Sequence, residues 1–159
     1  MNLTIAPNGV LQIDDARIIY RNFRGEGGKY NHEGDRNFAV IIPSEDMAEA
    51  LAAEGWNVKI KPPRDDGDDP FMYLSVKVRF NDRGPHIYLR SGNASQKLDE
   101  ENVGMLDRAD ISSVSMDIRP YDWEVNGGSG RAAYLLSMEA IQNIDRFAAR
   151  YAEEESPEE

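Results

Sequence analysis

The stretch "DISSVSMDIRPYDWEVNGGSGRAAYLLSMEAIQNI" (residues 110–144) contains the longest strand pattern in this chain. Its first part, residues 110–125, is rich in the β-branched and aromatic residues that strands favour. Residues 126–130, "NGGSG", have the composition of a hairpin turn. Residues 131–144 then return as a second strand. The stretch therefore predicts a long hairpin, bent at Pro120 because proline has no backbone donor.

Shorter strand patterns precede this hairpin and are separated by glycine- or proline-containing turns. Two of them flank a glycine-rich segment and predict a hairpin with a long, mobile tip. Another alternates apolar residues with lysines, which is typical of a half-buried strand. The predicted ranges are 10–23 (one strand, or two around Asp14 and Asp15), 36–43, 56–63, 71–80 and 85–92.

Helical signals are fewer. Ser44 is a good N-cap and Gly55 stands where helices end, so the segment between them predicts one mid-chain helix. Residues 98–106 predict a helical turn. Near the end of the chain, apolar residues recur at helical spacing and predict a C-terminal helix. These residues are Ile141, Ile144, Phe147 (or Ala148) and Tyr151.

This order of elements predicts a mainly β fold. A five-stranded Greek-key barrel of the OB type, with the mid-chain helix and the C-terminal helix added, fits the content. A β-sandwich fits it equally well, and periodicity does not separate the two. We expect one domain over residues 1–150, followed by a disordered acidic tail over residues 151–159, "YAEEESPEE".

The charge of the chain is strongly negative but unevenly distributed. The 159 residues carry a net charge of −11, of which the tail contributes five glutamates and leaves −6 for residues 1–150. Residues 64–70, "RDDGDDP", hold four aspartates against one arginine. Net charge alone argues against nucleic-acid binding, which needs lysine and arginine to neutralise phosphates. The remaining part is close to balanced, so a basic face is compatible with the composition.

The chain has no cysteine, which excludes disulfides and thiolate metal sites and agrees with a reducing compartment. The N-terminal residues lack the basic and apolar regions of a signal peptide, and no apolar run is long enough for a membrane span. We therefore expect a location in the cytoplasm and no membrane partner.

Enzyme and metal motifs are incomplete. "GEGGKY" (residues 25–30) lacks the spacing and the hydroxyl residue of a phosphate-binding NTPase loop. His32 and His86 are far apart in sequence, and "DDGDD" (residues 65–69) lacks the distal glutamate of a calcium loop. A solvated loop explains both features better. We expect no enzyme activity, no catalytic residue, no cofactor and no metal.

Aromatic and basic residues alternate on the open faces of several predicted strands. Single-stranded nucleic acid needs this combination, because cations follow the phosphates and rings stack on bases. The alternative is that the rings belong to the core and the bases serve solubility, and for each ring the sequence leaves this open. The candidate nucleic-acid-binding residues are Tyr20, Arg21, Arg24, Lys29, Tyr30, Arg36, Lys59, Lys61, Tyr73, Lys77, Arg79, Tyr88, Arg90, Tyr121 and Trp123, with Phe23 and Arg119 in the same pattern.

The glycine-rich segment between the first two strands has a role in this hypothesis. Glycine allows a backbone to approach phosphates closely, and Arg24, Lys29 and Tyr30 lie in or beside the segment. We expect this tip to close over a bound strand. The alternative is an ordinary hairpin tip.

Four segments together resemble phage and prophage single-stranded DNA-binding proteins of the OB fold. They are "RNFRGEGGKYNHEGDRNFAVIIP" (residues 21–43), "GWNVKIKPP" (55–63), "RPYDWEVNGGSGRAAYLLSMEAIQ" (119–142) and the acidic tail. The resemblance implies single-stranded DNA binding without base specificity in phage DNA replication or recombination. It also implies that the tail recruits partner proteins and competes for the DNA groove; the oligomeric state stays open.

A second hypothesis assigns this chain to protein–protein contact. In that case the acidic surface would mimic nucleic acid, as in a host-defence inhibitor or a replication accessory protein. Binding of labelled oligo-dT at several salt concentrations separates the two hypotheses, because only the first predicts a salt-sensitive complex with single strands.

Overall fold

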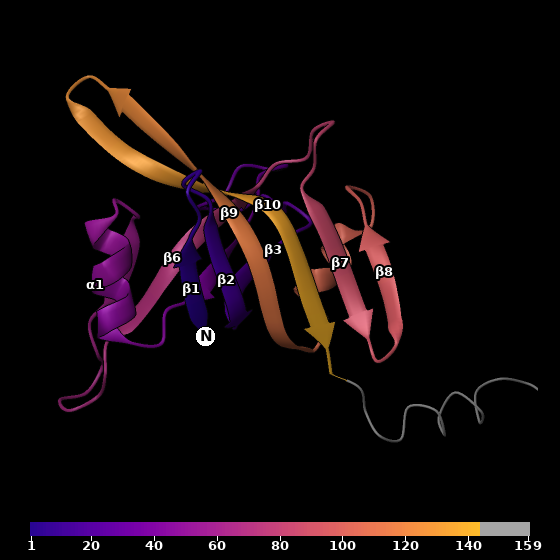
Figure 1. Cartoon of the computed structure of the whole chain (residues 1–159), viewed down its shortest axis with the longest axis horizontal. Helices are drawn as coiled ribbons and strands as arrows, with labels where there is room; N and C mark the ends of the chain where they lie inside the picture. Colours follow the sequence, from indigo (N-terminus) through magenta and orange to yellow (C-terminus); the bar gives the residue numbers. More distant parts are fainter. Residues whose placement is uncertain (144–159) are drawn as a thin grey trace, which may run out of the picture.

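The structure is a computed structural model, and it describes residues 1–143. In this part the chain forms ten β-strands, one α-helix and one short 3₁₀ helix (Figure 1). The elements are β1 (Asn2–Ile5), β2 (Leu11–Ala16), β3 (Ile18–Asn22), β4 (Arg36–Ile41), α1 (Glu45–Ala53), β5 (Val58–Lys61), β6 (Phe71–Val78), β7 (His86–Ser91), β8 (Ala94–Leu98), η1 (Val103–Asp107), β9 (Ile111–Val125) and β10 (Gly128–Gln142).

The strands form one curved sheet in the order β1-β2-β9-β10-β6-β4-β3. Three further strands join its edges: β5 pairs with β6, β7 with β10, and β8 with β7. The path runs from β1 to β3 without closing within the described residues. The sheet thus has ten strands, more than the five of the barrel type that was predicted, and β1 and β8 fall outside all of the predicted strand ranges. The range predicted as one strand or two is two strands, with Asp15 at a φ of 54° near their junction.

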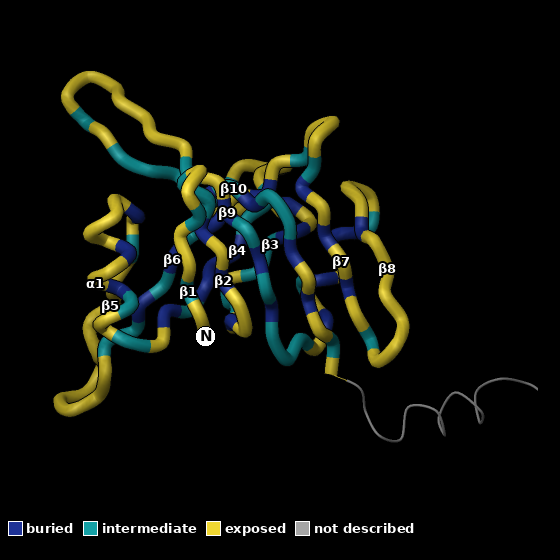
Figure 2. The backbone as a smooth tube through the Cα atoms, in the orientation of Figure 1, coloured by how far each residue is buried: buried dark blue, intermediate teal, exposed yellow. Residues whose placement is uncertain are grey.

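The core lies inside the curve of the sheet, and buried residues alternate with more exposed ones along strands such as β6, β7 and β9 (Figure 2). On β6, for example, Met72, Leu74, Val76 and Val78 are buried, as the alternation predicts. Phe23, at the end of β3, is fully buried and stacks on Phe38, with the ring centroids 5.0 Å apart. Phe23 is therefore a core residue and not part of a binding face.

Helix α1 begins and ends as predicted. The Ser44 side chain accepts a hydrogen bond from the backbone N–H of Met47 at 3.2 Å, and Glu54 forms the C-cap before Gly55. The buried residues Ala48 and Leu51 attach the helix to the core. Within residues 1–143, no helix is long and apolar enough to cross a bilayer.

Strands β9 and β10 form the long hairpin that the sequence predicts. Their register pairs Val125 with Gly128, so the turn is only Asn126 and Gly127, both with positive φ. A two-residue turn of this kind matches the twist of the flanking strands. Residues 120–133, here called the arm, project beyond the sheet at the upper left of Figure 1.

Strand β10 continues to Gln142, so Ile141 belongs to a strand and not to the predicted C-terminal helix. The helical turn predicted over residues 98–106 is confirmed as the 3₁₀ helix η1, which begins at Val103. The remainder of the predicted C-terminal helix, from Ile144, and the acidic tail at residues 151–159 lie outside the described residues. So does the proposed domain boundary at residue 150.

Candidate nucleic-acid interface

One row of side chains crosses the sheet where β10 changes partners. Lys77 on β6 faces Tyr134 on β10, and Tyr134 in turn faces Arg119 on β9. The Lys77 Nζ lies 5.8 Å from the centroid of the Tyr134 ring, and the Arg119 guanidinium lies 5.3 Å from it. On the other side of Lys77 the row continues to Asn37 on β4. An aromatic ring between two cations is thus presented on the outer face of three strands.

A second group, the aromatic cluster, adjoins this row along β6. It consists of Tyr20, Phe71, Tyr73, Lys59 and Lys61. Tyr20 meets Tyr73 edge to face at 5.4 Å, and the Lys61 Nζ donates a hydrogen bond to the Tyr20 hydroxyl at 2.9 Å. Tyr20 is 49% exposed, so its ring is available to a ligand. The hydrogen bond to Tyr20 raises the pKa of Lys61 above its ordinary value of 10.5, and the ammonium stays charged at neutral pH.

A groove of about 580 Å³ connects the row with the tip of the β3–β4 hairpin. Lys59, Lys77, Arg79 and Tyr134 line it from the sheet, and Tyr30 lines it from the tip. Tyr30 is 92% exposed, and the Lys29 Nζ lies 5.4 Å from its ring. The tip therefore brings one more ring and one more cation to the groove.

The β3–β4 tip contains a hydrogen-bond network of its own. The Asn31 amide nitrogen donates to the backbone carbonyls of Glu26, His32 and Asp35, and its oxygen accepts from Asn37. At the start of the tip, the Asp107 carboxylate accepts hydrogen bonds from the backbone N–H groups of the two residues after β3. These side-chain bonds to its backbone give the tip a defined shape, and its predicted mobility stays a prediction.

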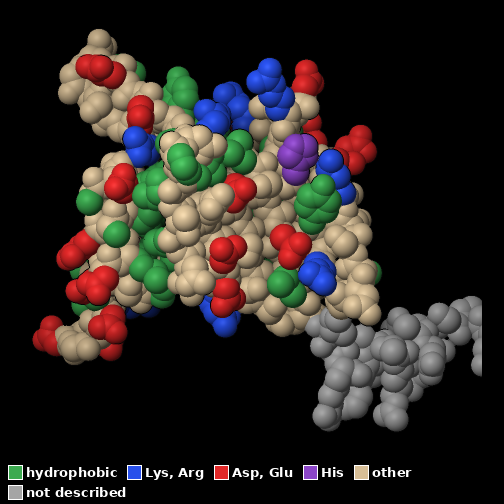
Figure 3. Space-filling model, viewed as in Figure 1, with side chains coloured by type: hydrophobic (Ala, Val, Ile, Leu, Met, Phe, Trp, Pro, Cys, Tyr) green, Lys and Arg blue, Asp and Glu red, His purple; other side chains and the backbone are tan. Residues whose placement is uncertain are grey.

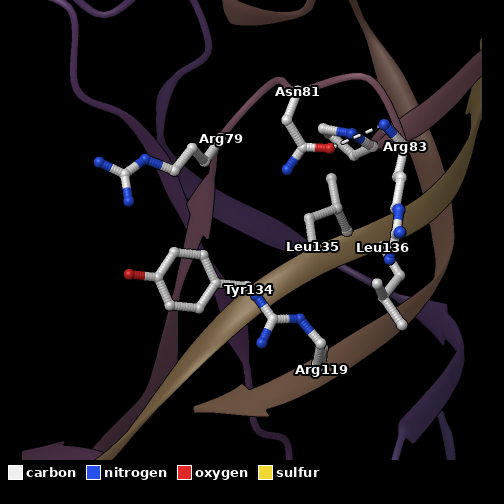
Figure 4. A pocket seen from close by; sticks show the side chains of 9 residues that line it. Arg79, Asn81, Arg83, Arg119, Tyr134, Leu135 and Leu136 are labelled. Atoms are coloured by element: carbon white, nitrogen blue, oxygen red, sulfur yellow. Dashed lines mark hydrogen bonds between the residues drawn. The ribbon is translucent and has the colours of Figure 1, made fainter. Parts of the chain in front are cut away.

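A second cavity, here called the fork pocket, opens where β6 leaves β10 and β7 joins it. It has a volume of about 450 Å³. Figure 4 shows Tyr134 and Leu135 at its centre, with arginines around them. Its lining residues are Arg79, Asn81, Arg83, Gly84, Pro85, Arg119, Tyr134, Leu135 and Leu136.

The arm extends the same face. Tyr121 and Trp123 alternate with acidic residues along β9 and are 52% and 43% exposed. The Tyr121 ring meets Tyr134 edge to face at 6.0 Å, so the arm continues from the row. Trp123 lies against Gly130 on the facing strand, where a Cβ would come within 2.7 Å of the indole. Only glycine leaves room for the ring in this position.

The opposite face of the arm is fixed to the helix. The Arg131 Nη1 donates to the backbone carbonyl of Glu54 at 2.6 Å, and the Arg131 Nε lies 2.7 Å from the Asp122 carboxylate. This hydrogen bond lowers the pKa of Asp122 below its usual 3.8 and raises that of Arg131. The guanidinium also lies 5.4 Å from the Trp56 ring. Arg131 therefore ties the base of the arm to the end of α1.

Three of the candidate cations are engaged with the protein itself. Arg21 donates from Nη1 to the carbonyls of Leu106 and Ala109, at 2.8 and 2.7 Å, and so holds η1 in place. Arg24 pairs with Glu26 at 2.8 Å. Arg36 is mostly buried between Phe80 and Glu100. These contacts are structural ones that the sequence pattern did not anticipate.

Two other candidates lie apart from the groove. Tyr88 and Arg90 are on β7, where they face Glu139 and Ile141 of β10, and Arg90 is 3.9 Å from the Glu139 carboxylate. Glu139 is five residues beyond Tyr134, or roughly 17 Å along the strand. The structure thus does not bring Tyr88 and Arg90 together with the other candidates.

Sequence reasoning missed two members of this face, Tyr134 and Phe71, and one residue of the fork pocket, Arg83. Tyr134 is opposite Arg119 in the β9–β10 register, so counting back from the Asn126-Gly127 turn would have found it. Phe71 lies two residues before Tyr73 on β6, so the alternation of a strand puts both side chains on the same face. Arg83 lies in a turn, and no local pattern marks it.

The charge on the molecule follows this arrangement. Figure 3 shows Lys and Arg side chains gathered along the upper edge, whereas acidic side chains are frequent around α1 and the loop below it. Only Asp35 and Glu100 are acids among the lining residues of the groove. A local basic face therefore exists on an acidic protein, and rings and cations alternate along it.

Comparison with known proteins identifies a family. The family model described as "Putative phage ssDNA-binding domain" matches residues 3–158. No curated protein sequence is similar enough to count as a relative.

Solved structures give the fold. The single-stranded DNA-binding protein from bacteriophage Enc34, in a C-terminally truncated form, matches with a TM-score of 0.60 at 15% identity, over 91% of each chain. The same phage protein in complex with ssDNA matches with a TM-score of 0.58 at 16% identity, over 92% of this chain and 94% of the other. At this identity the matches establish fold, and they confirm the predicted mainly β, OB-like class.

Proposed function

The chain belongs to the phage ssDNA-binding domain family, and from this premise we propose that it binds single-stranded DNA without base specificity. The observation that carries the proposal is the row of Arg119, Tyr134 and Lys77, which is continuous with the aromatic cluster. Rings and cations alternate there on one exposed face. Single strands require both, since bases stack on rings while phosphates contact cations.

We assign the strand path to the groove and its two neighbours. The aromatic cluster receives one part of the strand, the groove with Tyr30 above it the next, and the exposed side of the arm another. The residues in contact are Tyr20, Lys29, Tyr30, Lys59, Lys61, Tyr73, Lys77, Arg79, Arg119, Tyr121, Trp123 and Tyr134. Arg21, Arg24 and Arg36 act as positioning residues that hold η1 and the tip of the β3–β4 hairpin. A role for Tyr88 and Arg90 stays a prediction.

Stacking on protein rings needs unpaired bases, because a duplex hides their faces. We therefore expect preference for single strands over duplex. Base specificity is not expected, since every base has a face on which a ring can stack.

The acidic tail, residues 151–159, completes the proposal. Its five glutamates are attracted to the basic groove of the same chain, at an effective concentration of millimolar order because they are tethered. The tail competes with DNA, and DNA binding releases it to recruit replication or recombination proteins. The setting we propose is phage DNA replication or recombination in the cytoplasm of the host cell.

The test is a titration of labelled oligo-dT and of a duplex of equal length at several salt concentrations. We expect tighter binding of the single strand, with a log–log salt slope of about −0.7 per phosphate neutralised. Lys77→Ala should weaken binding and reduce the slope. Lys97→Ala is the matched control, because Lys97 lies on β8 over Tyr88 and outside the groove. Equal affinity for duplex and single strand would contradict a stacking surface.

A further inference from the structure

The fork pocket holds three arginines that have no acidic partner among the described residues. Arg79, Arg83 and Arg119 form no ion pair or side-chain hydrogen bond within residues 1–143. No carboxylate is among the residues that line the pocket. The groove differs, since Asp35 and Glu100 line it together with its cations. Three uncompensated guanidiniums around one cavity indicate a ligand with more than one negative charge.

The pocket exists because β10 changes partners at this point. Tyr134 pairs with β6, whereas pairing with β7 begins at Ser137. Between Tyr134 and Ser137 the β9–β10 register is also irregular, and Leu136 pairs with neither β6 nor β7. Strands β6 and β7 diverge here, joined by the Asn81–Gly84 turn. The opening between them is part of the architecture of the sheet and does not depend on one side-chain conformation.

The arginines come from three different segments of the chain, and the polar Tyr134 and the apolar Leu135 lie between them (Figure 4). Arg79 follows β6, Arg83 is in the turn before β7, and Arg119 is on β9. In Figure 4 they lie around Tyr134 and Leu135, and the Arg83 side chain extends toward Leu136. Guanidinium groups bind phosphate oxygens through paired N–H donors, which a lysine does not offer.

We propose that the fork pocket binds the terminal phosphate of a DNA strand whose body lies in the groove. An internal phosphodiester carries one negative charge, which leaves two of the three arginine charges in excess. A terminal phosphate monoester carries close to two charges at neutral pH and exposes three oxygens. The pocket shares Arg79 and Tyr134 with the groove, so the end of the strand reaches it directly. This inference rests on the proposed function, because it uses the same strand path.

The experiment compares three internally labelled oligo-dT strands of equal length, with hydroxyl ends, a 5′-phosphate or a 3′-phosphate. We expect one phosphorylated strand to bind about tenfold tighter than the hydroxyl-ended strand, as a charge-assisted contact implies. The strand that gains affinity identifies which end enters the pocket. Arg83→Ala should remove this difference and change binding of the hydroxyl-ended strand less than about twofold.

Arg17→Ala is the matched control, because Arg17 is exposed and lines neither cavity. It should keep the preference. Equal binding of all three strands by the wild-type protein would overturn the terminal-phosphate site while leaving single-strand binding intact. Equal loss of the preference in Arg17→Ala would overturn it too, since net charge would then be the cause. Failure to bind any strand would overturn the proposed function and this inference with it.

Discussion

Lys77 and Tyr134 face each other at the one parallel contact between β6 and β10, with the ammonium 5.8 Å from the ring. They are distant in sequence, and each belongs to a different neighbouring strand pair. Their meeting joins the β4–β6 part of the binding face to the β9–β10 arm. The pair is thus the centre of the proposed interface.

Tyr134→Ala should weaken oligo-dT binding about 5- to 150-fold, the equivalent of losing a stacking contact of about 1–3 kcal/mol. Tyr134→Phe keeps the ring and should bind nearly as the wild type does. Fluorescence anisotropy at fixed salt measures both. If the phenylalanine variant loses as much affinity as the alanine variant, the hydroxyl and not the ring carries the contact.

The tip of the β3–β4 hairpin gives a second prediction. Lys29→Ala combined with Tyr30→Ala should weaken binding but change the free energy of unfolding by less than about 0.5 kcal/mol, because both side chains are exposed. Asn31→Ala should act differently. It removes hydrogen bonds to three carbonyls and should lower both stability and affinity. Wild-type affinity in the Lys29/Tyr30 variant would reduce the tip to a connector.

Glycine at position 130 supplies a third prediction. Gly130→Ala places a methyl group within 2.7 Å of the Trp123 ring and should displace it, changing the exposed component of tryptophan fluorescence and weakening DNA binding. Trp56, the other tryptophan, is buried and serves as an internal reference. Gly128→Ala is the control, since its Cβ would meet only ordinary contacts of 3.5 Å or more.

The Asp122–Arg131 pair predicts a dependence on pH. The hydrogen bond from Arg131 lowers the folded-state pKa of Asp122 below 3.8. Its stabilising contribution is therefore present above pH 3.8 and is lost as the pH falls through the folded-state value. Asp122→Asn should lower the melting temperature slightly at pH 7, and the difference from wild type should shrink as the pH falls below 3.8. A difference that grows on acidification would have the wrong sign for this pair.

Removal of residues 153–159 tests the role assigned to the tail. The truncated chain should bind single strands more tightly at low salt, and the gain should shrink as salt screens the glutamates. A tail that serves solubility alone predicts at most a small change. Unchanged or weaker binding of the truncated protein at low salt would rule out competition for the groove.

Local patterns predicted those parts of the fold that local chemistry determines. Ser44 and Gly55 mark the helix because capping depends on a few adjacent residues. The alternation along β6 put Tyr73, Lys77 and Arg79 on one face, where they are found. By contrast, β1 and β8 are short edge strands of four and five residues, too short to give a clear alternation in the sequence, and each is defined by its pairing with one neighbour.

Long-range pairing decided what the sequence could not show about the site. Arg21 has the charge of a binding residue in a strand pattern, but its carbonyl partners come from η1 and the segment just after it, more than 80 residues later. Arg83 becomes a pocket residue only because β6 and β7 diverge along β10. The sequence therefore predicts which types of residue form the interface. Which of them lie together depends on how the strands pair, and local patterns do not show this.

The place of β10 in the sheet also bears on how the protein is made. This strand comes last among the described elements, yet it pairs with β9, β6 and β7 and is the only link between the β7–β8 hairpin and the other strands. A nascent chain still lacking it leaves three strands, β6, β7 and β9, each with an open edge, and has an incomplete core, so we expect folding to finish only after synthesis has passed Gln142. Stalled ribosome complexes of increasing length should gain protease resistance in one late step. Until that step, the growing chain depends on the ribosome and on chaperones to keep its edges from aggregating.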